Sequence, residues 1–260
     1  MLDPATRDQF RRHGYVWLRG FFDESETRDL RRWTDEIASW PETPGRWMRY
    51  YERGTDAGAK QLARIENFVP YHAALAALLT GTNVTSVLGE CCGEPVVLFK
   101  DKINFKLPGG AGFAPHQDAP AYVDFGVEHH LTLMVPVDAF TADNGCLEIS
   151  RWESRRETLP QNPDGTLRGG VMERWEIDRL LAQPGDAIVF DAWVPHRSGP
   201  NRTDGPRRSY YLTFNPAAAG DHRADYYARK RECFPPEYER IPGVDYAARG
   251  RQFNLGNPFD

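Results

Sequence analysis

The sequence has few cysteines, no long apolar run and no excess of positive charge. Four cysteines occur among 260 residues, and the adjacent pair Cys91-Cys92 has the spacing of neither a zinc knuckle nor a CxxC redox motif. Disulfide staples are not needed in a chain long enough to bury a large core. We therefore expect the cysteines to be reduced and mostly buried, as in a cytoplasmic protein.

Apolar residues are spread along the chain rather than gathered in one segment. The longest apolar stretch, Ala73–Leu79, is far too short to cross a bilayer, and no apolar core of a secretory signal follows Met1. The net charge of -5 at pH 7 argues against a basic face for nucleic acid. We expect a small-molecule substrate and neither a membrane nor a nucleic-acid partner, and the sequence indicates no particular oligomeric state.

The chain divides into a helical first part and a strand-rich second part. Asp3-Pro4 and Asp23 are typical helix starts, and a third helical stretch follows Pro70. Short apolar segments separated by turn residues then predict an antiparallel sandwich or barrel, so the fold is mainly β with flanking helices. We expect a single domain over residues 1–260, with a mainly helical flank at 1–94, a β core at 95–215 and a C-terminal tail at 216–260.

A strand over residues 97–107 is the clearest element of the second part. The pattern predicts one apolar and one polar face, with Val97, Phe99, Ile103, Phe105 and Leu107 at odd positions and Lys100, Lys102, Asn104 and Lys106 at even positions. Asn144-Gly145 predicts a hairpin turn between two further strands. The other strands are expected at 15–18, 131–137, 146–150, 186–191 and 209–215.

His116 and Asp118 form the first group of residues that could carry chemistry. Because residues i and i+2 of a strand point to the same side, both side chains can face one metal ion. A neutral imidazole and a carboxylate suit a divalent first-row metal. The pattern alone is weak evidence, since a surface histidine near an aspartate is common.

His196 follows another expected strand, much later in the chain. A lone histidine at such a place is usually structural. Together with His116 and Asp118, however, it completes the two-histidine, one-carboxylate set that holds non-haem Fe(II) and leaves three coordination positions open. Two of these positions could hold a 2-oxo acid, and the third could hold O2.

Arg207 shares one face of the last expected strand with Ser209, Tyr211 and Thr213. A buried arginine needs an acidic partner that it can bind with two hydrogen bonds, and the far carboxylate of 2-oxoglutarate would be such a partner. The alternative is a solvated Arg207-Arg208 pair in a turn. The first interpretation therefore depends on the metal site.

These motifs resemble the phytanoyl-CoA dioxygenase (PhyH) family of Fe(II)/2-oxoglutarate-dependent oxygenases, over roughly residues 8–215. The resemblance implies a double-stranded β-helix, the cupin-like jelly roll, with flanking helices. It also implies a dioxygenase that hydroxylates a C–H bond while 2-oxoglutarate is converted into succinate and CO2. The segments that carry it are His116-Gln117-Asp118, His196-x-Ser198-Gly199-Pro200-Asn201, Pro206-Arg207-Arg208, Phe10-x-x-x-Gly14-Tyr15, Gly20-Phe21-Phe22 and Asp143-Asn144-Gly145-Cys146-Leu147.

The resemblance also implies roles for individual residues. Iron would be held by His116, Asp118 and His196, which would be the catalytic site. The far carboxylate of 2-oxoglutarate would be bound by Arg207 with help from Ser198. A polar residue of the strand before His116 would lie beside the cosubstrate, and this would be Asn104 or, as the second choice, Lys102. That assignment requires the polar face of the strand to point into the barrel.

The substrate is predicted less directly. Gln117 and Tyr122 flank the metal motif and could line its mouth, whereas Arg64 and Asn67 are candidates to bind an anionic or zwitterionic substrate. The segment from Lys102 to Phe113 resembles family members that act on small polar molecules, such as aminoethylphosphonate or amino acids. A natural-product or acyl-CoA substrate is the alternative within the family.

Two other classes of protein remain as alternatives at this point. One is a cupin-like metalloenzyme that does not use 2-oxoglutarate, and an inward-facing Arg207 would argue against it. The other is a catalytically silent jelly-roll binding protein, which the presence of all three expected metal ligands disfavours.

Overall fold

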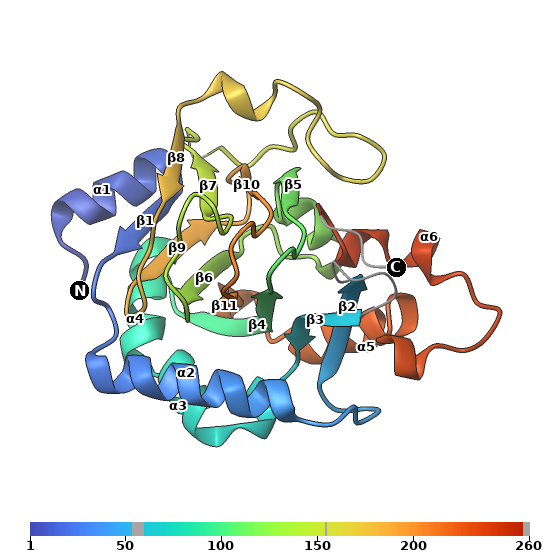
Figure 1. Cartoon of the computed structure of the whole chain (residues 1–260). Coiled ribbons are helices and arrows are strands. Elements are labelled where there is room, and N and C mark those ends of the chain that lie inside the picture. The colour runs from blue at the N-terminus through green and yellow to red at the C-terminus, as the bar shows by residue number, and fades with distance from the viewer. Residues whose placement is uncertain (54–59, 154, 257–260) are drawn as a thin grey trace.

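Two antiparallel sheets pack face to face in the computed structural model, which describes residues 1–53, 60–153 and 155–256 (Figure 1). The large sheet has the strand order β1-β9-β6-β11-β4-β3-β2, and the small sheet has the order β5-β10-β7-β8. This is the predicted jelly-roll core. The strands are β1 (Tyr15–Leu18), β2 (Met48–Arg53), β3 (Lys60–Glu66), β4 (Val96–Lys106), β5 (Phe113–His116), β6 (Leu131–Pro136), β7 (Leu147–Ser150), β8 (Ile177–Leu180), β9 (Ala187–Asp191), β10 (His196–Ser198) and β11 (Arg207–Pro216).

The helices start at the expected capping residues. Asp3 accepts a hydrogen bond from the backbone N–H of Thr6 at the start of α1, and Asp23 forms a reciprocal capping box with Glu26 at the start of α2. The α-helices are α1 (Pro4–His13), α2 (Glu24–Ser39), α3 (Ala73–Leu79), α4 (Thr82–Cys92), α5 (Arg223–Cys233) and α6 (Tyr246–Arg249). Short 3-10 helices include η1 (Val69–Tyr71), η2 (Ala119–Ala121) and η7 (Arg251–Phe253).

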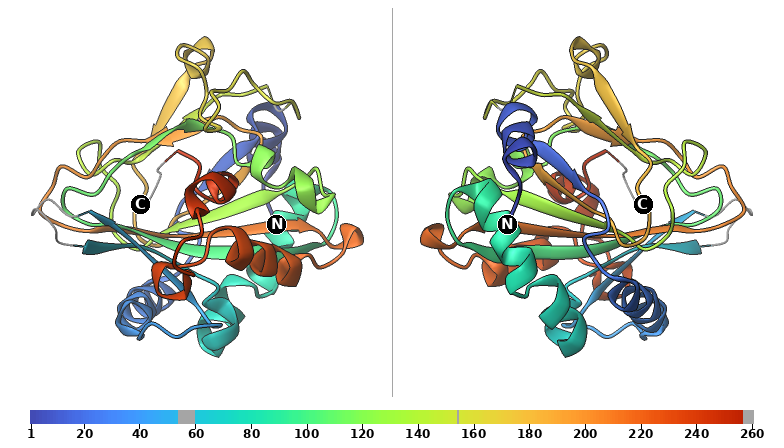
Figure 2. Two further views of the ribbon diagram at one scale, coloured as in Figure 1. Left: turned by 90° about the vertical axis from the view of Figure 1, so that its right-hand side faces the viewer. Right: turned by 90° about the vertical axis from the view of Figure 1, so that its left-hand side faces the viewer.

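Helices cover one face of the large sheet, and the small sheet faces the other (Figure 2). Leu30, Leu75 and Leu88 of three helices pack with Ile103 and Leu212 of the sheet on the helical side. On the other side, residues of both sheets form a second core, including Met134, Ile149, Leu180 and Ile188. Both faces of the central strands are therefore buried, and the polar residues on the inner face must find partners inside the barrel.

Two predicted local features are wrong in detail. The helical stretch after Pro70 is two helices, because α3 ends at Leu79 and a new helix starts at Thr82. Asn144-Gly145 does not join a pair of hydrogen-bonded strands, since β6 and β7 belong to different sheets. Gly145 has a φ of 75° and lies so close to Gly199 that a Cβ would be 2.0 Å from its carbonyl oxygen, so the turn brings β7 tightly against the end of β10.

The alternation expected along residues 97–107 is broken by a β-bulge. The register with β11 shifts between Thr213, opposite Lys100, and Phe214, opposite Leu98, so that Phe99 is the extra residue. Phe99 consequently packs with Tyr122 and not with Ile103, which lies on the helical side. The even-numbered polar residues from position 100 onward point into the barrel, as the cosubstrate assignment requires.

All four cysteines lie in the described part of the chain and are unpaired, but Cys146 alone is buried, so the expectation that most of them are buried is wrong. Among the residues that the structure describes, no helix combines the length and apolar character that crossing a bilayer requires.

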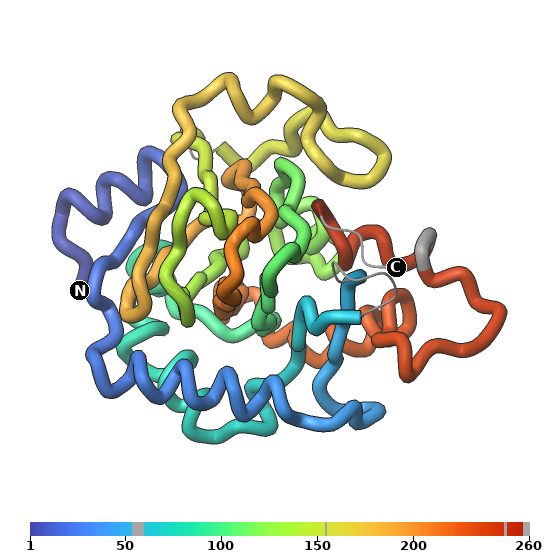
Figure 3. The backbone as a smooth tube through the Cα atoms, viewed as in Figure 1, coloured from blue at the N-terminus to red at the C-terminus, as the bar shows by residue number. Residues whose placement is uncertain are grey.

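The C-terminal tail packs onto the barrel through α5. Figure 3 follows the chain to its red C-terminal segment, which returns to β5, where the backbone N–H of Ala114 donates to the carbonyl oxygen of Gly256 at 2.8 Å. Tyr226, Tyr227 and Phe234 are buried and anchor the tail to the barrel.

Asp101 of β4 is fully buried and connects three elements. It accepts hydrogen bonds from the backbone N–H groups of Phe68 (2.7 Å) and Val69 (3.2 Å), and it forms an ion pair with Arg223 of α5. The Tyr227 hydroxyl donates to its carbonyl oxygen at 2.9 Å. One carboxylate therefore fixes both the segment after β3 and the tail helix to the large sheet.

We predict that Asp101→Ala lowers the free energy of unfolding by about 3 kcal/mol, because the largely buried guanidinium of Arg223 loses its carboxylate and two buried backbone donors lose their acceptor. Urea denaturation measures this change. Asp225→Ala on the exposed face of α5 is the control and should stay within about 0.5 kcal/mol of the parent. Equal denaturation midpoints for the parent and Asp101→Ala would contradict the prediction.

Candidate metal centre and ligand cavity

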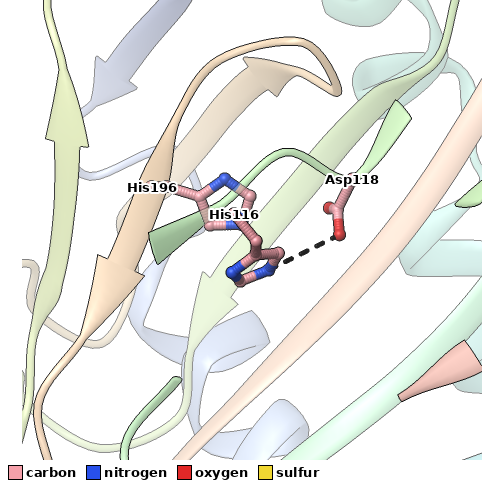
Figure 4. Close-up of side chains that lie close together, drawn as sticks. All are labelled: His116, Asp118 and His196. Carbon is pink, nitrogen blue, oxygen red and sulfur yellow. Dashed lines mark ion pairs between the residues drawn. The ribbon is translucent and has the colours of Figure 1, made fainter. Parts of the chain in front are cut away.

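The three predicted metal ligands meet inside the barrel (Figure 4). His116 ends β5 and is the register partner of His196, the first residue of β10. Asp118 lies two residues beyond His116, just before η2. One potential ligand atom from each of the three residues lies within 4.8 Å of the other two, and the Nε2 of His116 is 3.8 Å from the Oδ1 of Asp118.

Both imidazoles are held by backbone carbonyl groups. The Nδ1 of His116 hydrogen-bonds with the carbonyl oxygen of Ala114 at 2.7 Å, and the Nδ1 of His196 with that of Val194 at 3.0 Å. Since a carbonyl oxygen only accepts, each Nδ1 carries the proton, which leaves each Nε2 as a metal ligand. The sequence analysis could not name these orienting groups.

The protonation states of the triad suit a divalent metal. Burial, and then the neighbouring His196, lower the pKa of His116 to about 3, and burial also lowers the pKa of His196. Burial by itself would raise the pKa of Asp118, but the charges of His196, Lys100 and Lys102 hold it well below its usual range. Two neutral imidazoles and one carboxylate thus converge at neutral pH, and this donor set fits Fe(II).

Arg207 points into the barrel and is fully buried. Its guanidinium stacks 4.1 Å from the ring centroid of Phe140, and one nitrogen donates weakly to the Ser209 hydroxyl at 3.5 Å. Its Nε and Nη2 have no hydrogen-bond partner among the described residues. A buried cation with two free donors is costly unless a ligand supplies an acid, and the far carboxylate of 2-oxoglutarate fits this requirement.

Ser198 and Asn104 lie close to this arginine in the fold, and Lys106 joins them. Ser198 is two residues beyond His196, and its hydroxyl accepts a hydrogen bond from the Nζ of Lys106 at 2.8 Å. Asn104 is the register partner of Ser209, and its Oδ1 is buried without a hydrogen-bond partner. Burial, and then the charge of Arg207, lower the pKa of Lys106 to about 6. The even spacing along β4 could have singled out Lys106, but sequence reasoning did not select it.

A cavity opens beside the metal ligands toward the C-terminal segment. Its wall contains the predicted residues Arg64 and Tyr122, and also Lys102, which therefore lies on the open side of the metal centre. It also contains three charged residues that sequence reasoning missed, namely Lys100, Glu66 and Lys230. Apolar and tail residues complete the wall: Phe113, Ala121, Tyr226, Gln252, Phe253 and Leu255.

Positive charge predominates in this cavity. Glu66 is paired with Lys230 at 2.6 Å and with Arg64 at 3.3 Å. Lys100 and Lys102 form no ion pair with any residue in the described ranges, and the contacts of their ammonium groups are with the rings of Tyr122, Tyr226 and Tyr211. Two ammonium groups without an ion-pair partner, beside a metal centre, would suit an anionic ligand.

Two predicted substrate residues do not reach the cavity. Gln117 follows the last residue of β5 and is fully buried outside the cavity lining, where its amide bonds the backbone of Trp193, Glu157 and Leu159. Asn67 lies outside the cavity, with its side chain bonded to Arg46 and Arg223. Asn67 follows the end of β3 and has a φ of 59°, which turns the chain away from the cavity.

The jelly-roll core, the buried facial triad and the unpaired inward arginine define the class of non-haem Fe(II)/2-oxoglutarate-dependent dioxygenases. A family model for "Phytanoyl-CoA dioxygenase (PhyH)" matches residues 10–209. The chain therefore belongs to the phytanoyl-CoA dioxygenase family of Fe(II)/2-oxoglutarate-dependent oxygenases. Its cofactor is Fe(II), and 2-oxoglutarate and O2 are its cosubstrates.

Individual relatives cover almost the whole chain. A 2-aminoethylphosphonate dioxygenase from the uncultured bacterium HF130_AEPn_1 is 45% identical over 253 residues, covering 97% of each chain. A methylphosphonate hydroxylase from Gimesia maris is 41% identical over 90% of this chain and 88% of its own. Among solved structures, EctD from S. alaskensis with 2-oxoglutarate and 5-hydroxyectoine shares the fold, with a TM-score of 0.71, 21% identity and coverage of 84% of this chain and 77% of its own.

Buried lysines make the metal-free protein sensitive to pH. Burial, and then the charge of Lys100, lower the pKa of Lys102 to about 7, whereas an unfolded lysine keeps its proton to about pH 10. The unfolded chain therefore binds more protons than the native protein above pH 7, so stability increases with pH there.

We predict that the thermal unfolding midpoint of the metal-free protein rises between pH 7 and 8.5, and that Lys102→Met makes this rise smaller. Differential scanning calorimetry at several pH values measures the effect. Lys60→Met removes an exposed lysine and should leave the slope of the parent unchanged. A midpoint that falls with pH in the parent would contradict the prediction.

Proposed function

We propose that this enzyme hydroxylates the carbon atom bonded to phosphorus in a small organophosphonate. In this proposal, Fe(II) is held by His116, Asp118 and His196. A second group of residues, Arg207, Ser198 and Asn104, holds 2-oxoglutarate. The reaction converts the phosphonate, O2 and 2-oxoglutarate into the hydroxylated phosphonate, succinate and CO2.

The uncompensated ammonium groups of Lys100 and Lys102 are the observation that carries the proposal. They line the same cavity as His116 and Asp118, and neither forms an ion pair with a described residue. A phosphonate is a compact anion with up to two negative charges, so it can neutralise both groups at once. Lys102, expected beside 2-oxoglutarate, is therefore assigned to the substrate.

The names of two relatives support the same chemistry. Methylphosphonate contains a single carbon atom, which is bonded to phosphorus, so its hydroxylation takes place there. The substrate named for the other relative, 2-aminoethylphosphonate, contains the same carbon–phosphorus unit. A phosphonate fixed by the lysines beside the triad would present this carbon to the metal centre.

When bound, Fe(II) and 2-oxoglutarate supply the oxidising power for breaking a C–H bond with O2. The side chains of the protein contribute position and shielding. Backbone carbonyl groups orient the two imidazoles, Arg207 fixes one end of the cosubstrate, and Lys100 and Lys102 fix the substrate anion. The aromatic and tail residues of the cavity wall reduce the access of water.

The proposed site also implies that residues 1–260 act as one catalytic domain. Arg64 comes from β3 in the first part of the chain, the triad from the jelly-roll core, and Lys230 and Phe253 from the tail. The substrate cavity would therefore be incomplete if any one of the three segments were missing.

We expect the purified protein, supplied with Fe(II), 2-oxoglutarate and O2, to release succinate when methylphosphonate or 2-aminoethylphosphonate is added. Phosphorus NMR should detect the corresponding 1-hydroxyalkylphosphonate. His196→Ala should show less than about 1% of this activity, because it removes a metal ligand. The absence of a hydroxylated phosphonate, with an intact Fe(II)/2-oxoglutarate complex, would refute the proposed function.

Arg207→Met should weaken the binding of 2-oxoglutarate about 100-fold, because two charge-assisted hydrogen bonds are lost. Anaerobic titration, followed through the visible charge-transfer band of the Fe(II)/2-oxoglutarate complex, measures the affinity. Arg208→Met is the matched control, since Arg208 follows on the same strand but pairs with Asp138 at 2.8 Å on the other face. Similar losses in both variants would argue against a specific role for Arg207.

A further inference from the structure

Glu66 at the end of β3 has one carboxylate oxygen that the protein itself does not use. The residue is 1% exposed, lines the cavity and is the register partner of Lys102. Its Oε1 accepts hydrogen bonds from the Nζ of Lys230 at 2.6 Å and from Arg64 at 3.3 Å. Its Oε2 is buried and has no hydrogen-bond partner in the described part of the chain.

The charge of Glu66 is maintained despite its burial. Burial would raise the pKa of this carboxyl group, but the positive charges of Lys230 and Arg64 lower it to about 2. A buried, ionised oxygen without a donor is unfavourable, and a ligand that brings an N–H donor would relieve the cost. The missing partner is therefore a hydrogen-bond donor, and an N–H of a substrate amino group would fill this role.

The surroundings of Glu66 also suit an ammonium group. Tyr226 and Phe253 line the same cavity, and their ring centroids lie 5.9 and 5.7 Å from the Nζ of Lys230. These rings stabilise the ammonium group of Lys230, and the same two residues line the cavity that a ligand would enter. On the neighbouring strand β4, Lys100 and Lys102 are positively charged and would attract an anion.

We propose that the Oε2 of Glu66 accepts a hydrogen bond from a primary ammonium group of the substrate, so that the enzyme selects 2-aminoalkylphosphonates over simple alkylphosphonates. This inference rests on the proposed phosphonate hydroxylase function. Glu66 and Lys102 are cross-strand partners on one face of the sheet, which places an anion-binding and a cation-binding group side by side. A zwitterion whose charges are separated by two carbon atoms can contact both.

The test compares 2-aminoethylphosphonate with ethylphosphonate, which has the same carbon skeleton but no amino group. We expect kcat/KM of the parent enzyme to favour the amino substrate by about 100-fold or more, since a site built for a substrate donor rejects the analogue that lacks it. Glu66→Gln should reduce this preference by at least about tenfold, mainly through a higher KM for the amino substrate. Its kcat/KM for ethylphosphonate should fall less than its kcat/KM for the amino substrate.

The matched control is Glu52→Gln, which removes a half-buried carboxylate of β2 that does not line the cavity. It should keep the preference of the parent. Thermal unfolding and the Fe(II)/2-oxoglutarate charge-transfer band show whether each variant is folded and loaded.

A measurement on the parent alone avoids any effect of the substitution on folding. N-acetyl-2-aminoethylphosphonate keeps the phosphonate but removes the ammonium charge, and its kcat/KM should be reduced about 100-fold or more relative to the amino substrate.

Three results would overturn the inference while leaving the phosphonate hydroxylase function in place: equal use of amino and ethyl substrates by the parent, equal losses on both substrates in Glu66→Gln, or efficient use of the N-acetyl compound. Failure of the parent to hydroxylate any phosphonate, with the charge-transfer band present, would instead refute the proposed function and with it the inference.

Discussion

The pairing of β5 with β10 is the interaction on which the metal centre depends. Because His116 and His196 are register partners, the hydrogen bonds of the small sheet determine the distance between the two imidazoles. β10 is also paired with β7 on its other side, so His196 cannot shift without disturbing both neighbours. Asp118 then needs only the i, i+2 relation to His116. The backbone of one small sheet therefore fixes all three ligands: His116 and His196, which are distant in sequence, and Asp118, which lies in the turn after β5.

The inner face of the large sheet gives this centre its electrostatic character. β4 and β11 direct Lys100, Lys102, Lys106 and Arg207 into a barrel whose walls offer them few acids. The protein alone neutralises these positive charges poorly. A dicarboxylate and a phosphonate ligand would neutralise them. The buried cations whose desolvation destabilises the folded protein are thus the same residues that we assign to the binding of anions.

The sequence was most informative where local periodicity decides the structure. The spacing of His116 and Asp118, and the position of Arg207 on the inner face of β11, follow from strand alternation and family resemblance. Glu66 and Lys230 could not be predicted, because they meet only when β3 and α5 pack against the same end of the barrel. Gln117 was expected at the mouth of the metal site because it adjoins a metal ligand in sequence. Such proximity does not decide the direction in which a side chain points.

The hydrogen bond between Ala114 and Gly256 has a consequence for the order in which the molecule can assemble. Both sheets are complete in sequence at the end of β11, whereas Gln252, Phe253 and Leu255 of the cavity wall lie some forty residues later. The strands can therefore pair and the iron ligands can come together before this segment docks, while one side of the cavity is still open to solvent. The environment from which water is excluded forms only when the last described residues pack against β5.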